Sequence, residues 1–337
     1  MPGSRDQLPP GAAHAAVKRE LLVRYLDAAV PAVLHGARRF TYVDRSTPAA
    51  GGAEPSAVAA VRVFGEFADL FGGRRLTMLL SAAQPDPLDA LAARVAAARK
   101  ELGDPAWLEI RTVPDADLPR ALTAAGAKGA PVFAYLDAAG PAPPPGAALP
   151  EAPALSEVPA LSEVPALPAL PALAGNPHGE ALVALDATGP DDHRDLLRRK
   201  GFRVVTDVEL VDERGNPQLV LFACATDKGL DRFKNALWAV DEFAGVRYRD
   251  PRDRERALLD ISLSPHLGPL RRALVDRVRT GACTVADLQQ HARTETIYRA
   301  ADATRALTAL MSAGTLARSP ERGRLTADTL IRPGGAA

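Results

Sequence analysis

Histidines and cysteines, the side chains that most often act as proton carriers, nucleophiles or metal ligands, are scattered along this chain. The six histidines occur singly, and no HExxH, GxSxG or GxxxxGK[ST] motif is present. His193 and His291 fall at the ends of predicted helices, where an imidazole usually caps the helix or faces solvent. Cys224 and Cys283 have no CxxC or histidine-rich context, so neither a metal site nor a disulfide framework is predicted.

Arginines dominate the charge near the carboxyl end. Residues 267–332 contain eleven arginines and no lysine against six acidic residues. Five of these arginines lie on a predicted helix or beside a predicted hairpin, where winged-helix folds contact phosphates. These candidate DNA-binding residues are Arg299, Arg305, Arg318, Arg322 and Arg324. An arginine-rich, solvated face that docks another protein explains the pattern equally well.

The elements that would position these residues alternate between helix and strand over residues 16–137. Apolar periodicity predicts helices at 16–34, 56–71, 86–102 and 115–125, and strands at 39–44, 75–80, 107–112 and 131–136. Because a parallel neighbour needs a crossover connection, this alternation predicts right-handed βαβ units and a parallel sheet. The expected fold class is α/β, a Rossmann-like sandwich.

Residues 176–260 should complete this domain. A strand at 181–186 and a helix at 191–199 precede two further strands, which a turn at Gly215 separates, and an amphipathic helix with Trp238 on its apolar stripe. A terminal antiparallel hairpin of this kind distinguishes a class I methyltransferase-type sheet from a dinucleotide-binding one.

Two segments are predicted to be disordered: the N-terminus at 1–15 and a proline-rich insertion at 138–175, in which LSEVPA occurs twice. Residues 267–332 predict a separate winged-helix domain, with helices near 267–279, 284–291 and 299–312. Its strands are expected at 315–317 and 324–326, with Thr284 as an N-cap and Gly314 as a left-handed cap.

The composition indicates a soluble, cytoplasmic protein. Basic and acidic residues balance at 41 each, and 47% of residues are hydrophobic, which suffices for a core. The first twenty residues lack the apolar centre of a signal peptide, and no apolar run approaches the roughly 18 residues that span a bilayer. No membrane partner is therefore expected.

Several segments resemble the three-Cys-motif partner family, TcmP. Residues 221–226 (LFACAT) and 229–241 (GLDRFKNALWAVD) are similar to its LvFAT-type strand and GLxxMKxAMWxVD-type helix. Residues 18–26 and 42–44 resemble its opening helix and first strand. The resemblance implies a methyltransferase-like domain, a C-terminal winged helix, and action beside a three-Cys-motif protein that itself resembles radical S-adenosylmethionine enzymes. It implies no established reaction for the partner.

The family's cofactor and active-site motifs have changed in this chain. Where the family shows YIDGFAGPG, this chain retains Asp44 but continues with Arg45, and the later Gly51 and Gly52 suit a flexible turn as well as a cofactor loop. The second strand ends without an acid for the ribose hydroxyls. A DPFG-type motif is reduced to Asp137-Ala138-Ala139-Gly140.

By this resemblance, Asp44, Gly51 and Gly52 are the residual cofactor-binding candidates, and Asp137 is the residual catalytic candidate. The combined changes predict a pseudoenzyme, a TcmP-like partner protein that needs no cofactor. Two alternatives stay open: an active S-adenosylmethionine-dependent methyltransferase, and a winged-helix regulator that binds DNA.

Overall fold

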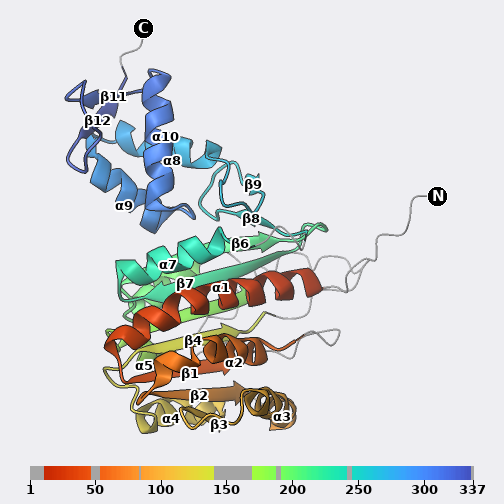
Figure 1. Cartoon of the computed structure of the whole chain (residues 1–337). Coiled ribbons are helices and arrows are strands. Elements are labelled where there is room, and N and C mark those ends of the chain that lie inside the picture. Colours follow the sequence, from red (N-terminus) through yellow and green to blue (C-terminus); the bar gives the residue numbers. More distant parts are fainter. Residues whose placement is uncertain are drawn as a thin grey trace.

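The computed structural model describes residues 11–46, 54–82, 85–139, 169–186, 191–240 and 245–334. Its centre is a nine-stranded sheet, whose strands are β1 (Arg39–Arg45), β2 (Arg75–Ala82), β3 (Leu108–Pro114), β4 (Val132–Asp137), β5 (Gly179–Asp186), β6 (Val204–Val211), β7 (Pro217–Cys224), β8 (Arg247–Arg249) and β9 (Leu258–Leu259). They are ordered β3-β2-β1-β4-β5-β7-β6-β8-β9 (Figure 1).

The sheet is mostly parallel on one side and antiparallel on the other. Strands β1 to β5 pair in parallel, and β7 runs antiparallel to both β5 and β6. The predicted α/β class, parallel sheet and antiparallel hairpin are confirmed. The short strands β8 and β9 extend the hairpin edge and were not predicted, since two or three residues carry little periodicity.

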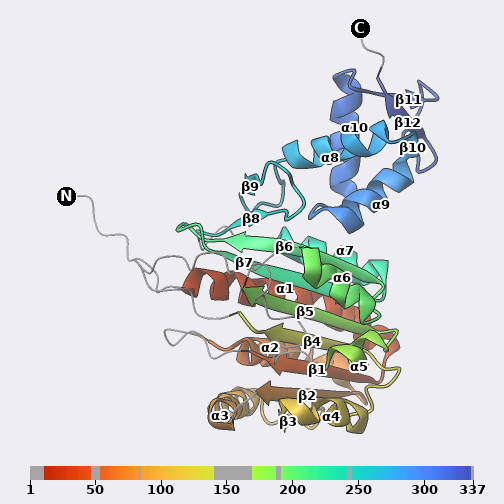
Figure 2. The ribbon, with the colours of Figure 1, turned by 180° about the vertical axis from the view of Figure 1, so that it is seen from behind.

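Helices cover both faces of the sheet (Figures 1 and 2). One face packs against α1 (Ala12–Gly36), α2 (Ser56–Glu66), α3 (Pro85–Glu101) and α7 (Asp227–Leu237). The other packs against α4 (Leu118–Ala124), α5 (Leu170–Ala174) and α6 (Asp191–Arg199). Short 3₁₀ turns, Ala68–Phe71 and Asp115–Asp117, take up parts of the predicted helices at 56–71 and 115–125. No helix in the described part of the chain is long and apolar enough to cross a membrane.

The predicted disordered segments need correction at their ends. Helix α1 begins at Ala12, inside the segment expected to be disordered. Helix α5 lies inside the expected proline-rich insertion, with Leu170 and Leu173 buried against the sheet. Pro171 sits in the first turn of α5, where a missing N–H costs no helical hydrogen bond. Residues 140–168 lie outside the described residues.

The C-terminal unit contains three helices and a small antiparallel sheet. Its elements are α8 (Gly268–Arg279), β10 (Cys283–Thr284), α9 (Val285–Glu295), α10 (Ala300–Ser312), β11 (Leu316–Ser319) and β12 (Leu330–Pro333). The strands are ordered β10-β12-β11. Thr284 caps α9 in a reciprocal pair with Asp287, and Gly314 has a φ of 72°, as predicted.

The strand expected at 324–326 lies instead at β12, because Thr326 and Thr329 form a turn. The Thr326 amide donates to the hydroxyl of Thr329, and the Thr329 amide donates to the Thr326 carbonyl. Pairing with β11 therefore starts only at Leu330. The histidine expectations also change: His193 is buried in α6, and His291 lies within α9 rather than at its end.

A buried lysine joins the two units. Lys234 of α7 is 1% exposed, and its ammonium donates hydrogen bonds to the carbonyl oxygens of Ala292, Thr296 and Tyr298. These carbonyls lie at and just beyond the C-terminal turn of α9, where a cation is favourable. All three ammonium protons are thereby satisfied, and the hydrophobic core continues from the large sheet into the C-terminal unit.

Candidate functional site

The carboxyl ends of the parallel strands form the edge at which open α/β sheets bind ligands. Asp44 and Asp137 lie at this edge, on the neighbouring strands β1 and β4, whose register pairs Asp44 with Tyr135 and Arg45 with Leu136. The structure therefore brings together the two acids that the sequence singled out. Gly51 and Gly52 lie outside the described residues.

Each acid is preceded two positions earlier by a tyrosine on the same strand. Because side chains alternate along a strand, residues two apart share one face of the sheet. The Tyr42 hydroxyl donates to Asp44 Oδ2 at 2.6 Å, and the Tyr135 hydroxyl donates to Asp137 Oδ2 at 3.3 Å. We refer to these four residues as the paired Tyr-x-Asp ends.

Asp44 is fully buried and bonded on both carboxylate oxygens. Besides Tyr42, the hydroxyl of Ser46 donates to Oδ1 at 2.6 Å, and the hydroxyl of Ser56, in the first turn of α2, lies 3.0 Å from Oδ2. Burial raises the pKa of Asp44 to about 6, while the hydrogen bonds from these hydroxyls oppose the rise. Asp44 is thus a buried acid that is held by its own chain.

Asp137 has a cationic partner. The Lys18 ammonium, on α1, lies 2.7 Å from Asp137 Oδ2, and both side chains are nearly buried, at 7% and 11% exposed. The amide of Ala139 adds a 3.2 Å hydrogen bond to Oδ1. A carboxylate that is paired with an ammonium and bonded to a backbone amide is held in a fixed position.

Arg45, the last residue of β1, links the segment that follows β3 to the end of β4. Its Nε lies 3.3 Å from Asp115 Oδ2, and its Nη1 donates to the carbonyl oxygen of Asp137 at 3.4 Å. Asp115 follows β3 and also accepts a 2.7 Å hydrogen bond from the hydroxyl of Ser81, near the end of β2. The end of β2 has no acid of its own, as the sequence indicated, but its Ser81 is hydrogen-bonded to Asp115, which follows β3.

Sequence reasoning missed Lys18, Arg45 and Asp115 as parts of this edge. The repeated tripeptides Tyr42-Val43-Asp44 and Tyr135-Leu136-Asp137 were an available signal, because both lie at the carboxyl ends of parallel strands. At this edge, the carboxylates are hydrogen-bonded to hydroxyl groups or paired with the two cations, Lys18 and Arg45. Asp44 is fully buried, so its carboxylate cannot reach a substrate as a general base without rearrangement.

Two cavities of the described structure lie away from these acids. One, of about 820 Å³, lies at the opposite edge of the sheet, among the amino ends of β1, β4 and β5 and the start of α7. The other, of about 500 Å³, lies beside α8 and contains Arg252, His291 and Tyr298. Neither is lined by Asp44 or Asp137.

The candidate DNA-binding arginines fall into two groups. Arg299 and Arg305 both contact the buried carboxylate of Asp302, at 2.9 Å and 2.8 Å. Arg299 also donates to the carbonyl of Leu263. Arg318 donates to carbonyl oxygens of its own loop at Pro320 and Gly323. Arg322 and Arg324 are exposed.

Potential metal-ligating side chains are dispersed among the described residues. No group of three or more His, Cys, Asp or Glu side chains among them could hold a metal ion. Both cysteines are buried thiols, and burial raises the pKa of Cys224 to about 12, which leaves it a poor nucleophile or ligand.

No family model and no curated protein matches this chain. Among solved structures, one described as the delta-N METTL16 MTase domain is similar at 15% sequence identity. The match covers 60% of this chain and 81% of that chain, with a TM-score of 0.30. The mixed α/β class follows from the sheet itself.

Proposed function

We propose that this chain is a methyltransferase-like pseudoenzyme that acts as a binding partner, beside a protein of the three-Cys-motif type. The strand order, in which antiparallel β7 lies between β5 and β6, supports the methyltransferase-like assignment. The proposed loss of activity is supported by the carboxyl edge of the sheet, where Lys18 forms an ion pair with Asp137 and Arg45 forms one with Asp115.

S-adenosylmethionine fits this edge poorly. Its amino acid and sulfonium portions need close backbone approach, yet Asp44 is followed at once by Arg45, whose side chain reaches across to Asp115. The sulfonium is positive, but Asp137 and Asp115 are already paired with Lys18 and Arg45, so neither carboxylate offers it a free negative charge. The ribose hydroxyls would also meet Ser81 in place of a free carboxylate at the end of β2.

The partner role rests on the resemblance of residues 221–226 and 229–241. In the structure, Leu230, Phe233 and Trp238 of this segment are buried, and Trp238 contacts the C-terminal unit. The matched residues therefore form part of the core and part of the junction between the two units. Such residues maintain the fold and need not take part in catalysis.

DNA binding through the C-terminal unit receives less support. Arg299 and Arg305 are ion-paired with Asp302, so Arg322 and Arg324 are the exposed candidates that have no acidic partner among the described residues. DNA-binding proteins obtain much of their affinity from roughly six to ten phosphate contacts, and two arginines would supply only a small part of it. We propose that this unit is a winged helix.

Titration calorimetry tests the loss of cofactor binding directly. We expect no saturable heat from S-adenosylmethionine or S-adenosylhomocysteine up to about 1 mM. A low-micromolar dissociation constant for either, weakened in Asp44→Asn, would restore the active-methyltransferase alternative.

The partner role needs a separate experiment. The gene next to this one should encode a protein with a cysteine triplet of cluster-binding spacing, and the two proteins should co-elute in size-exclusion chromatography after co-expression. A neighbour with the triplet that elutes separately from this chain would contradict the partner role and leave the cofactor result unaffected.

A further inference from the structure

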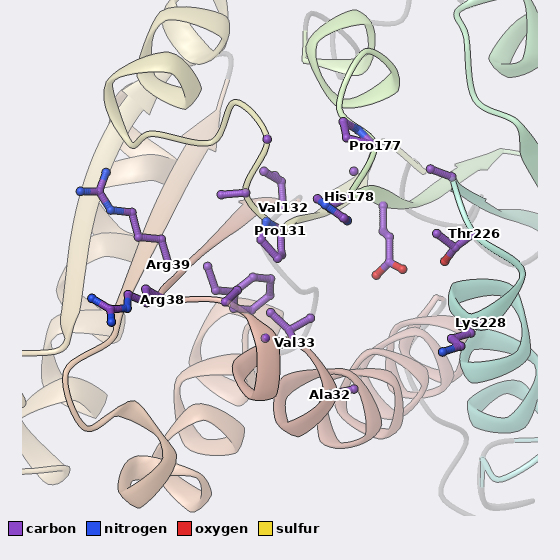
Figure 3. Close-up of a pocket in the computed structure, with 18 of the residues that line it drawn as sticks. Ala32, Val33, Arg38, Arg39, Pro131, Val132, Pro177, His178, Thr226 and Lys228 are labelled. Carbon is purple, nitrogen blue, oxygen red and sulfur yellow. The ribbon is translucent and has the colours of Figure 1, made fainter.

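The cavity at the amino edge of the sheet is suited to a ligand. Its volume of about 820 Å³ lies within the range of small-molecule sites, roughly 300–1,000 Å³. Val33, Pro131 and Val132 form an apolar middle, with Arg38 and Arg39 at one end and Lys228 at the other (Figure 3). This cavity is independent of the carboxyl edge and of the proposed function.

The charge of the lining is strongly one-sided. It includes the cations Arg38, Arg39, Lys228 and Arg232 together with His178, against a single acid, Glu180. Both carboxylate oxygens of Glu180 are already engaged: Arg232 Nη2 lies 3.1 Å from Oε1, and the Tyr25 hydroxyl donates to Oε2 at 2.5 Å. The whole chain has no net charge, so the excess of cations around this cavity does not simply reflect the overall composition.

Arg232 carries an unsatisfied donor. Its Nε donates weakly to the carbonyl of Lys228, its Nη2 is paired with Glu180, and its guanidinium lies 6.0 Å from the centre of the Tyr25 ring. The remaining nitrogen, Nη1, is buried without a hydrogen-bonding partner among the described residues. A buried unsatisfied donor is costly. Because Nη1 has almost no accessible surface in this structure, an anion in the cavity would remove that cost only after a shift of the Arg232 side chain.

A glycine permits this arrangement. A Cβ atom at Gly229 would lie 2.4 Å from Glu180 Oε1, so no other residue could stand there without moving the carboxylate. Glu180 in turn fixes Arg232 at the cavity wall. Packing therefore fixes the position of the Arg232 guanidinium, which does not move freely as an exposed arginine would.

We propose that this cavity binds a small organic anion, a phosphate ester or carboxylate with an apolar body. The apolar middle takes the body of the ligand, and the basic groups at the ends take its charge. A phosphate ester and a carboxylate share this chemistry, and the experiment separates them.

The probes are phenyl phosphate, benzoate and inorganic phosphate, with phenol as the neutral analogue. At about 50 mM salt, we expect calorimetric dissociation constants below about 1 mM for phenyl phosphate or benzoate, and weaker binding of phenol and inorganic phosphate. The tighter of the two anions identifies the class. Phenol binding as tightly as the anions, or no binding of either anion, overturns the proposal.

Matched variants locate the binding. Gly36 lines the cavity, and a Cβ atom there meets nothing within 4 Å, so Gly36→Asn and Gly36→Asp should both fold. They have the same shape and differ by one charge. We expect Gly36→Asp to bind the anion at least about threefold more weakly than Gly36→Asn, and Lys228→Gln about fivefold more weakly than wild type.

Arg214→Gln, in the exposed turn between β6 and β7, is the distant control. It should bind like the wild type. Equal binding by the two Gly36 variants, or equal weakening by Arg214→Gln and Lys228→Gln, would show that the anion does not occupy this cavity.

Discussion

The indole nitrogen of Trp238 donates a 3.0 Å hydrogen bond to the carbonyl oxygen of Ile297. Trp238 directly follows α7 of the large unit, and Ile297 belongs to the C-terminal unit. The Trp238 ring also stacks on Tyr298, with ring centres 5.6 Å apart. The tryptophan is fully buried, as its helical spacing predicted. It contacts Tyr248 of the large sheet and also lies at the junction of the two units. The two units should therefore unfold together.

Replacing Trp238 should separate packing from hydrogen bonding. We expect Trp238→Ala to lower the free energy of unfolding by about 3–5 kcal/mol. Trp238→Phe keeps a ring but leaves the Ile297 carbonyl without its indole donor, which should cost about 1–3 kcal/mol. Urea unfolding, followed by circular dichroism, measures both.

Fluorescence provides an independent check of the Trp238 environment. In a Trp107→Phe background Trp238 is the sole tryptophan, and iodide should quench its native emission poorly because the ring is fully buried. Strong quenching would show instead that Trp238 is presented to a partner.

Asp44 should make stability fall as pH rises. Its folded pKa is raised to about 6 from 3.8, so below about pH 4 the carboxyl is protonated in both states and its contribution is fully present. Between these values the unfolded chain loses its proton first, and the native state loses up to about 3 kcal/mol by pH 7. Relative to Asp44→Asn, the wild type should therefore lose stability from pH 4 to pH 7. A difference between the two proteins that stays constant with pH would contradict this assignment.

Arg299 and Arg305 should matter for stability. Changing both to alanine leaves the buried Asp302 carboxylate without its guanidinium partners, which should cost roughly 2–4 kcal/mol, between the values for exposed and buried ion pairs. The exposed pair Arg322 and Arg324, changed together, should alter stability by less than about 0.5 kcal/mol. Chemical denaturation distinguishes the two double variants.

The same variants test DNA binding. We expect the wild type not to shift a mixed-sequence duplex at about 50 mM salt in an electrophoretic mobility assay. A salt-dependent shift that Arg322→Ala and Arg324→Ala abolish would favour the DNA-binding alternative over the partner role.

The proline-rich segment should be removable up to, but not including, α5. Deleting residues 141–167 should leave the melting temperature nearly unchanged, since a proline-rich repeat adds no ladder hydrogen bonds and a long loop costs little closure entropy. Deleting 141–174 also removes the buried Leu170 and Leu173, which should cost at least about 3 kcal/mol and lower the melting temperature by several degrees. Equal melting temperatures for the two deletions would mean that α5 contributes nothing.

The sequence by itself determined the local elements and their order. Alternating helical and strand periodicity predicted the parallel sheet, and the turn at Gly215 between two apolar runs predicted the hairpin of β6 and β7. Thr284 and Gly314 predicted the start of one helix and the end of another. These features depend on residues a few positions apart, so the chain encodes them directly. Helix α5 was missed because proline opposes a helix everywhere except in its first turn.

Only the tertiary structure decided which side chains meet. Lys18 and Asp137 are 119 positions apart, and Tyr25 and Glu180 are 155 apart, yet each pair is in hydrogen-bonding contact. No periodicity encodes such pairs, because they depend on which strands become neighbours, in what register, and which helix then covers that face. For the same reason, the chain showed the two acids that close β1 and β4, whereas the cations that neutralise this edge and the basic cavity at the opposite edge became visible only in the folded sheet.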